Sequence, residues 1–136
     1  MKELLLKLLF ICLGASIGAV SRYLISAGAD AMFKGNFPWG TFIVNSMGCF
    51  LIGAAFWILI TSEVKTHFQP FFVTGLLGSF TTFSTYMMEI VNLAKEGKHT
   101  SAFTSFLTHN LVGVVMVLVG AFCMELITKR IAIHNL

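Results

Sequence analysis

The sequence predicts an all-α integral membrane protein that forms one transmembrane domain over residues 1–136, with four membrane-spanning helices. Of the 136 residues, 57% are apolar and only 11% are charged, which is unusual for a water-soluble domain. Several uncharged stretches are long enough to cross a bilayer, since about 20 residues at about 1.5 Å each span the hydrocarbon. The separators between them are short, so there is no room for a soluble catalytic domain.

The four helices are predicted over about residues 4–27, 39–62, 69–93 and 100–127. The first is an uncharged run that apolar residues extend on both sides. Each of the other three overlaps a longer uncharged run, at 39–62, 66–88 and 100–124. The separators "GNFP" (35–38), "TSEVKTHFQP" (61–70) and "AKEGKH" (94–99) carry Gly, Pro and charged residues, which are typical of turns.

Lysine and arginine residues are divided almost equally between the two sides of the membrane. Four spans place Lys2, Lys7, Lys65, Lys129 and Arg130 on one side, and Arg22, Lys34, Lys95 and Lys98 on the other. Because an excess of these residues sets orientation, a chain this balanced is expected to insert both ways round. Copies of opposite orientation could pair as an antiparallel dimer with the symmetry of an inverted repeat. The alternative is one fixed orientation with a weak bias.

Small and polar residues indicate which helix faces meet other helices rather than lipid. At spacings of three and four residues, they form one group per helix: Gly14, Gly18, Ser21 and Arg22; Thr41, Asn45 and Gly48; Ser105, His109, Gly113 and Gly120. Asn45 either bridges helices or lines a wet path, because an unbonded amide is costly in hydrocarbon. Arg22 either extends to the membrane surface or draws anions towards an opening. For His109 the simplest interpretation is a hydrogen bond between helices.

The stretch "GLLGSFTTFSTYMME" at 75–89 predicts a third helix that is broken near its middle. Gly75 and Gly78 precede a dense run of Ser and Thr, whose hydroxyls compete with regular helical hydrogen bonding. Irregular backbone at membrane depth is tolerated only where it is buried or lines a watery cavity. We therefore expect a break at 78–82, with freed carbonyl groups that can coordinate a cation.

Beyond the expected break, Thr82, Thr85 and Glu89 share one helix face, and Phe83 and Tyr86 lie to one side of it. Aromatic ring edges are partly positive, so edge-on rings beside hydroxyl and amide donors can replace part of an anion's hydration shell. The alternative is a packing seam of Ser and Thr. The residues alone thus indicate a channel or transporter, with an anion as one candidate for its cargo.

Three motifs in order resemble those of the CrcB/Fluc fluoride channels: "GASIGAVSRY" at 14–23, "GTFIVNSMGCFLIG" at 40–53 and "GLLGSFTTFSTYMME" at 75–89. The resemblance implies a multi-pass channel of the plasma or inner membrane that lowers cytoplasmic fluoride by passive efflux and confers fluoride resistance. It implies a dual-topology homodimer with two pores and a structural sodium ion (Na+) at the centre of the dimer interface. No enzymatic activity and no nucleic-acid partner are expected.

The resemblance also implies roles for individual residues. The carbonyl groups of Gly78 and Thr81 are expected to hold sodium. Phe83 and Tyr86 fall on the family's pore aromatic pair, and Asn45 falls on its pore asparagine. The remaining matches are Ser84, Thr85 and Thr41 at polar positions near the ion path, Arg22 in the vestibule, and Glu89 as the acidic residue after the aromatic pair.

Two positions depart from the family's pattern. Tyr86 stands where the family usually has phenylalanine, so we expect its hydroxyl to add a donor or to alter ion passage. In the fourth helix the family has serines and a tyrosine near the pore, whereas this chain reads "TSFLTHNLVG" at 104–113. The alignment of this stretch with the family's fourth helix is open by one residue. Ser105, Thr108 and His109 are therefore candidates for the pore.

Two other functions fit a four-helix membrane protein. A small multidrug-type proton-coupled antiporter is expected to have an essential glutamate embedded in its first helix. Here Glu3 lies at the extreme end of that helix, and the embedded acid is Glu89 in the third. A purely structural or assembly role would use the polar residues as contacts between helices, and it predicts no ion flux from purified protein.

Overall fold

The computed structural model describes residues 1–61 and 69–134, with side chains as far as Ile131. All regular structure in these residues is helical: α1 (Lys2–Met32), α2 (Trp39–Thr61), η1 (Gln69–Leu77), α3 (Gly78–Phe80), α4 (Phe83–Lys95) and α5 (His99–His134). The predicted end of the second helix at residue 62, most of the following separator and its Lys65 lie outside the described residues.

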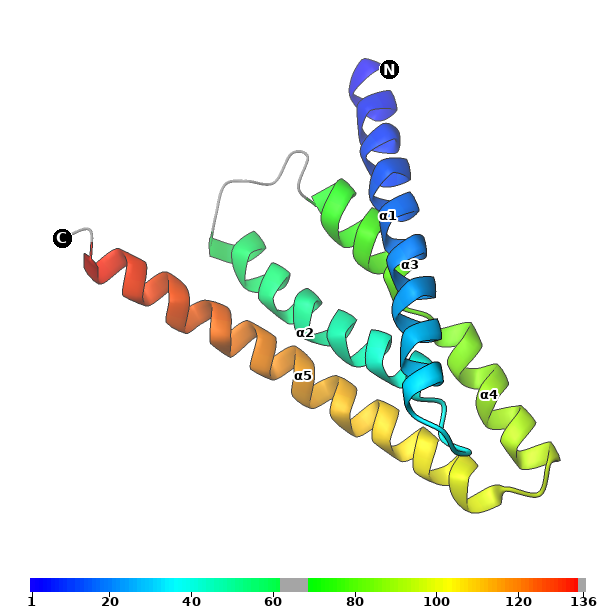
Figure 1. The fold of residues 1–136 in the computed structure, drawn as a ribbon. Coiled ribbons are helices and arrows are strands. Elements are labelled where there is room, and N and C mark those ends of the chain that lie inside the picture. Colours follow the sequence, from blue (N-terminus) through cyan, green and yellow to red (C-terminus); the bar gives the residue numbers. More distant parts are fainter. Residues whose placement is uncertain (62–68, 135–136) are drawn as a thin grey trace.

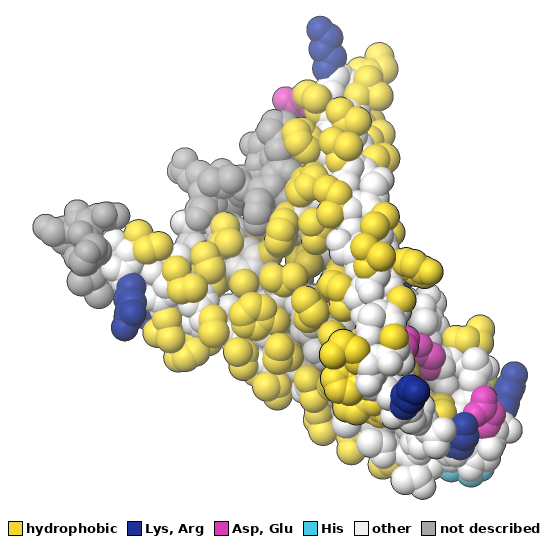
Figure 2. Space-filling model, in the orientation of Figure 1, with side chains coloured by type: hydrophobic (Ala, Val, Ile, Leu, Met, Phe, Trp, Pro, Cys, Tyr) yellow, Lys and Arg dark blue, Asp and Glu magenta, His cyan; other side chains and the backbone are white. Residues whose placement is uncertain are grey.

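Within the described part of the chain, three helices are long and apolar enough to cross a membrane: Lys2–Met32, Trp39–Thr61 and His99–Ile131. They overlap three of the four predicted ranges and extend beyond two of them. Figure 2 shows hydrophobic side chains along the bodies of the helices, with charged side chains mostly near their ends. This distribution fits helices whose outer surfaces meet lipid rather than water. The chain is therefore an all-α membrane protein.

Residues 69–95 are helical but divided into three segments. The wide-turned helix η1 continues directly into the short α3, and α4 begins after two residues in extended conformation. These are Thr81 (φ −84°, ψ 157°) and Thr82 (φ −147°, ψ 110°). The extended pair lies within the 78–82 interval that the glycine and threonine content singles out.

The helices associate as two main pairs. Figure 1 shows α2 and α5 side by side along most of the length of α2, with the 69–80 segment running along α1. The α4 helix packs against the first part of α5. The interruption at residues 81–82 therefore lies where the two pairs come together.

Glycines allow the helix backbones within each pair to approach closely. A Cβ atom added at Gly18 would collide with the backbone carbonyl of Leu76, and one added at Gly53 would collide with that of Val117. Gly120 is similarly confined by the backbone of α2. The prediction that Gly18 and Gly120 face neighbouring helices is confirmed, whereas the role of Gly53 was not predicted.

The two turns at one end of the molecule have defined chemistry. The Asp30 carboxylate accepts a hydrogen bond from the backbone N–H of Gly40 at 2.7 Å, which satisfies a free donor in the first turn of α2. Between α4 and α5, Gly97 has a φ of +74°, and the N–H of Lys98 bonds back to the carbonyl of Leu93 at 2.9 Å. This arrangement closes α4 with a glycine in the left-handed region. Both turns thus fix where the next helix begins.

Candidate functional site

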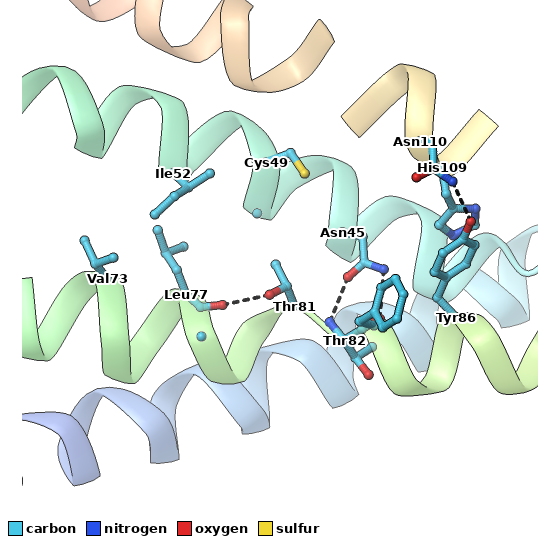
Figure 3. A pocket seen from close by; sticks show the side chains of 13 residues that line it. Asn45, Cys49, Ile52, Val73, Leu77, Thr81, Thr82, Tyr86, His109 and Asn110 are labelled. Carbon is cyan, nitrogen blue, oxygen red and sulfur yellow. Dashed lines mark hydrogen bonds between the residues drawn. The ribbon is translucent and has the colours of Figure 1, made fainter. Parts of the chain in front are cut away.

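The candidate site is a pocket of about 380 Å³ beside the interruption at Thr81 and Thr82 (Figure 3). Its walls come from α2, the 69–80 segment, the beginning of α4 and the first part of α5. The lining residues are Asn45, Gly48, Cys49, Ile52, Val73, Leu77, Gly78, Thr81, Thr82, Phe83, Tyr86, His109 and Asn110. A few amide, hydroxyl and imidazole groups therefore stand on a mainly apolar wall, as in sites that orient a small ligand.

Asn45 connects α2 to the interruption. Its side-chain Nδ2 donates to the carbonyl oxygen of Thr82 at 3.1 Å, and its Oδ1 accepts from the N–H of the same residue at 2.8 Å. The amide thus takes the place of the helical partners that Thr82 lacks in its extended conformation. Of the two interpretations of Asn45, the bridge between helices is confirmed, and one N–H of its amide is left for the pocket.

The threonines at the interruption bind their own backbone. The Thr82 hydroxyl accepts from the N–H of Thr85 at 3.3 Å and donates to the Thr85 hydroxyl oxygen at 2.8 Å, so Thr82 caps the first turn of α4. The Thr81 hydroxyl donates to the carbonyl of Leu77 at 3.1 Å. The hydroxyls of this motif therefore stabilise the ends of the two helical segments.

Tyr86 is almost completely buried, and its hydroxyl is bonded to α5. The hydroxyl donates to the carbonyl oxygen of Phe106 at 3.2 Å and accepts from Nδ2 of Asn110 at 2.8 Å (Figure 3). Because a phenol has one proton, the single donor of Tyr86 is directed at the carbonyl group of α5. Asn110 was not among the predicted site residues, because its only signal in the sequence was its place next to His109.

His109 lies against the ring of Tyr86, with centroids 4.4 Å apart and planes at 21°. Its Nδ1 is 2.8 Å from the carbonyl oxygen of Ser105 and 3.4 Å from the Ser105 hydroxyl. The edge of Phe42 contacts it from α2, at a centroid distance of 5.2 Å. Its Nε2 is buried and has no hydrogen-bond partner within the described part of the chain. The ring is therefore held in place while one nitrogen remains unused.

A second polar contact joins α2 to α4. The Thr41 hydroxyl donates to Oε1 of Glu89 at 2.6 Å, and Thr41 is buried. The other carboxyl oxygen of Glu89 is buried without a hydrogen-bond partner among the residues described. Glu89 also lines a second hollow of about 460 Å³, together with Asp30 near the end of α1 and Glu96 in the turn after α4. This contact lies outside the first pocket.

The structure brings six of the predicted site residues together around the first pocket: Asn45, Gly78, Thr81, Phe83, Tyr86 and His109. Phe83 lines the opening and is 72% exposed, with its ring at 5.8 Å and 68° from that of Tyr86. In this edge-to-face arrangement the partly positive edge of one ring meets the partly negative face of the other.

The other predicted residues lie elsewhere. Ser105 is fully buried behind His109, and the Thr108 hydroxyl donates to the Thr104 carbonyl of its own helix at 2.8 Å. Ser84 and Thr85 are exposed on α4. Arg22 is half-buried within α1, lines neither hollow and makes no ion pair within residues 1–61 and 69–131.

Comparisons with known proteins cover most of the chain. The family described as "CrcB-like protein, Camphor Resistance (CrcB)" matches residues 9–121. The chain is 40% identical over 119 residues to the fluoride-specific ion channel FluC of Salinibacter ruber, spanning 88% of this chain and 90% of that protein. It is 39% identical over 124 residues to FluC of Shewanella loihica, spanning 91% and 98%. It is 37% identical over 118 residues to FluC of Phocaeicola vulgatus, spanning 87% and 98%.

Proposed function

The chain belongs to the CrcB family, and from this membership we propose that it is a fluoride-selective channel of the cell membrane. The observation that carries the proposal is the alignment with fluoride-specific ion channels over about nine-tenths of their length. Fluoride would leave passively, because an interior-negative potential favours anion exit by about 2.3 kcal/mol per charge per 100 mV. The relatives are named as ion channels, so neither a catalytic step nor the proton-coupled antiporter is favoured.

We further propose that residues 69–95 cross the membrane as a third, broken helix and that two chains of opposite orientation form the channel. In a single chain, Phe83 is 72% exposed, and the polar residues Ser84 and Thr85 that follow it are also exposed. Polar groups at membrane depth are costly when they face lipid. A second copy would cover this surface, and the near-equal division of Lys and Arg supports insertion in both senses.

The orientation proposal can be tested with a cysteine introduced at Lys34, in the turn between α1 and α2. A membrane-impermeant thiol reagent should label about half of the molecules when it is added outside intact spheroplasts, and again about half when it is added outside inverted membrane vesicles. Labelling confined to one side would refute dual topology.

A sodium ion would fit the interruption through backbone oxygens. The proposed ligands are the carbonyl groups of Gly78 and Thr81, which line the pocket at this point. Such oxygens suit hard cations. No cluster of His, Cys, Asp or Glu in the described part of the chain has the arrangement of a metal site. Sodium would supply fixed positive charge where the two copies meet.

The proposed fluoride path runs along the aromatic pair and its neighbouring donors. The ring edges of Phe83 and Tyr86 would face the ion, since partly positive edges can replace water around a small anion. The remaining N–H of Asn45 and the Thr85 hydroxyl, which accepts from Thr82 and keeps its own proton, are the nearest donors. Ser84 and Thr41 would extend this polar path, Arg22 would attract anions to the vestibule, and Glu89 would stand at its acidic end.

The test is ion efflux from liposomes that contain the purified protein, with the voltage set by a potassium ionophore. Fluoride should leave while chloride stays inside, and equal leakage of both would refute selectivity. Phe83→Ile should suppress fluoride efflux without dissociating the dimer. Phe56→Ile is the matched control, because Phe56 is an exposed phenylalanine on α2 that does not line the pocket. Unchanged efflux in Phe83→Ile would remove that ring from the path.

A further inference from the structure

His109 lines the pocket and stands in the middle of a row of aromatic rings. From Phe83 the row passes to Tyr86 at 5.8 Å and then to His109 at 4.4 Å. Beyond His109 it reaches Phe42 at 5.2 Å and Phe37 at 6.0 Å, in the turn that precedes α2. Among these five rings, only the imidazole changes its charge near neutral pH. A protonation step in this row would therefore occur at His109.

The contacts of the imidazole define which nitrogen carries its proton. Nδ1 lies 2.8 Å from the carbonyl oxygen of Ser105, a group that can only accept. In the neutral ring Nδ1 must then be the N–H, and Nε2 is left as a bare acceptor. Nε2 is also the buried nitrogen that has no partner in residues 1–61 and 69–131. A bare lone pair at this position repels an anion.

We propose that the protonated form of His109 donates a hydrogen bond from Nε2 to the permeating fluoride, so that conduction through this channel increases as the medium becomes more acidic. The inference rests on the proposed fluoride channel. A second proton converts the unused acceptor into a charged donor, and charge-assisted hydrogen bonds are the stronger kind. The Tyr86 hydroxyl cannot take this role, because its proton is given to Phe106.

The surroundings of His109 hold the ring without compensating its charge. Its ring contacts are Phe37 in the turn, Phe42 on α2 and Tyr86 on α4, and its hydrogen-bond partner is Ser105 on α5. Asn45, Cys49 and Asn110 line the same pocket. Of these, only the thiol and the phenol titrate, and both are neutral where imidazole titrates. Glu89 lies one turn beyond Tyr86 and is bonded to Thr41. No ion pair joins a carboxylate of the described residues to His109, so the anion itself would balance the imidazolium.

The sign of the effect follows from the donor. Below the midpoint of the imidazole titration the Nε2–H is present and can bind the passing fluoride. As the pH rises through that midpoint the donor is lost and fluoride conduction decreases. Acidic surroundings are also the condition in which fluoride enters a cell, because neutral HF crosses lipid. A proton-linked channel would therefore conduct best when the fluoride load is greatest.

The first experiment compares fluoride efflux between about pH 5.5 and pH 8, the range in which histidine changes charge. Equal pH is set on both sides of the liposome membrane, and leakage of HF from protein-free vesicles is subtracted. The unaltered protein should conduct about tenfold faster at the acidic end, the size expected for a hydrogen bond to a charged group. His109→Gln should lose this dependence. His99→Gln, which changes an exposed histidine at the start of α5, should keep it.

The outcomes separate this inference from the proposed function. A flat pH profile in the unaltered protein, or an unchanged slope in His109→Gln, would overturn the role of His109 while leaving the channel intact. Absence of fluoride efflux at every pH would overturn both.

A second measurement does not depend on the folding of a His109 variant. In a protein with His67, His99 and His134 replaced by Gln, His109 gives the only imidazole NMR signals. Fluoride should move the midpoint of its titration to higher pH and chloride should not, because binding to the protonated form favours that form. The same midpoint with and without fluoride would refute direct contact.

Discussion

Replacement of Asn45 by leucine is expected to destabilise the backbone at the interruption. The Asn45 amide makes two hydrogen bonds to Thr82, at 3.1 and 2.8 Å, and Thr82 is only 8% exposed. Leucine has a similar volume but leaves the N–H and C=O of Thr82 without those partners. Each buried backbone group that loses its partner costs about 1–3 kcal/mol, so the two together cost about 2–6 kcal/mol.

Hydrogen exchange at the amide of Thr82 measures this cost locally, because exchange reports the free energy of opening. The lower figure corresponds to roughly thirtyfold faster exchange in Asn45→Leu, since each 1.4 kcal/mol is about a factor of ten. Asn45→Asp keeps an oxygen for the Thr82 N–H, so its exchange rate should lie between those of Asn45→Leu and the unaltered protein. Asn92→Leu, which replaces an exposed asparagine on α4, should leave the rate unchanged. Equal exchange at Thr82 in Asn45→Leu and the unaltered protein would refute the reasoning.

Two further substitutions test the packing around the site through thermal unfolding in detergent. Thr41→Val removes the hydroxyl that donates to Glu89, which should lower the free energy of unfolding by about 1–3 kcal/mol; Thr41→Ser keeps the donor, and equal stability of the two variants would contradict the assignment. Gly18→Ala forces a methyl group against a neighbouring backbone and should cost about 1–3 kcal/mol. Gly28→Ala meets no atom within 4 Å and should be neutral or slightly stabilising, so a similar loss in both alanine variants would count against close packing at Gly18.

Helix positions could be read from the sequence because lipid imposes a simple rule on it. Long uncharged runs predict α1, α2 and α5, and the described helices match them apart from their ends. The first helix reaches Met32 rather than 27, and the last reaches His134 rather than 127. Helix ends are hard to predict here because the residues beyond the apolar run can stay helical outside the hydrocarbon. The packing face of α1 that contains Gly14 and Gly18 was also predictable, since the spacing of glycines can be read directly from the sequence.

The hydrogen-bond partners of the polar side chains were harder to predict from the sequence than the helix positions. The sequence left Asn45 with two interpretations, because its contact with Thr82 joins residues 37 positions apart. The hydroxyl of Tyr86 was expected to add a donor or to alter ion passage, and its bonds to Asn110 and Phe106 could not be read from the sequence. That outcome depends on how α4 is rotated against α5, a geometric relation that no periodicity in either segment contains.

The bond between Tyr86 and Asn110 has a consequence for how such chains diverge. With phenylalanine at position 86, the amide of residue 110 would lose the oxygen to which it now donates at 2.8 Å. With an apolar residue at 110, the phenol would lose a donor. The two positions should therefore covary, so that a substitution at one is accompanied by a substitution at the other among related sequences. A residue that departs from a family's usual motif would then mark a paired change on a distant helix.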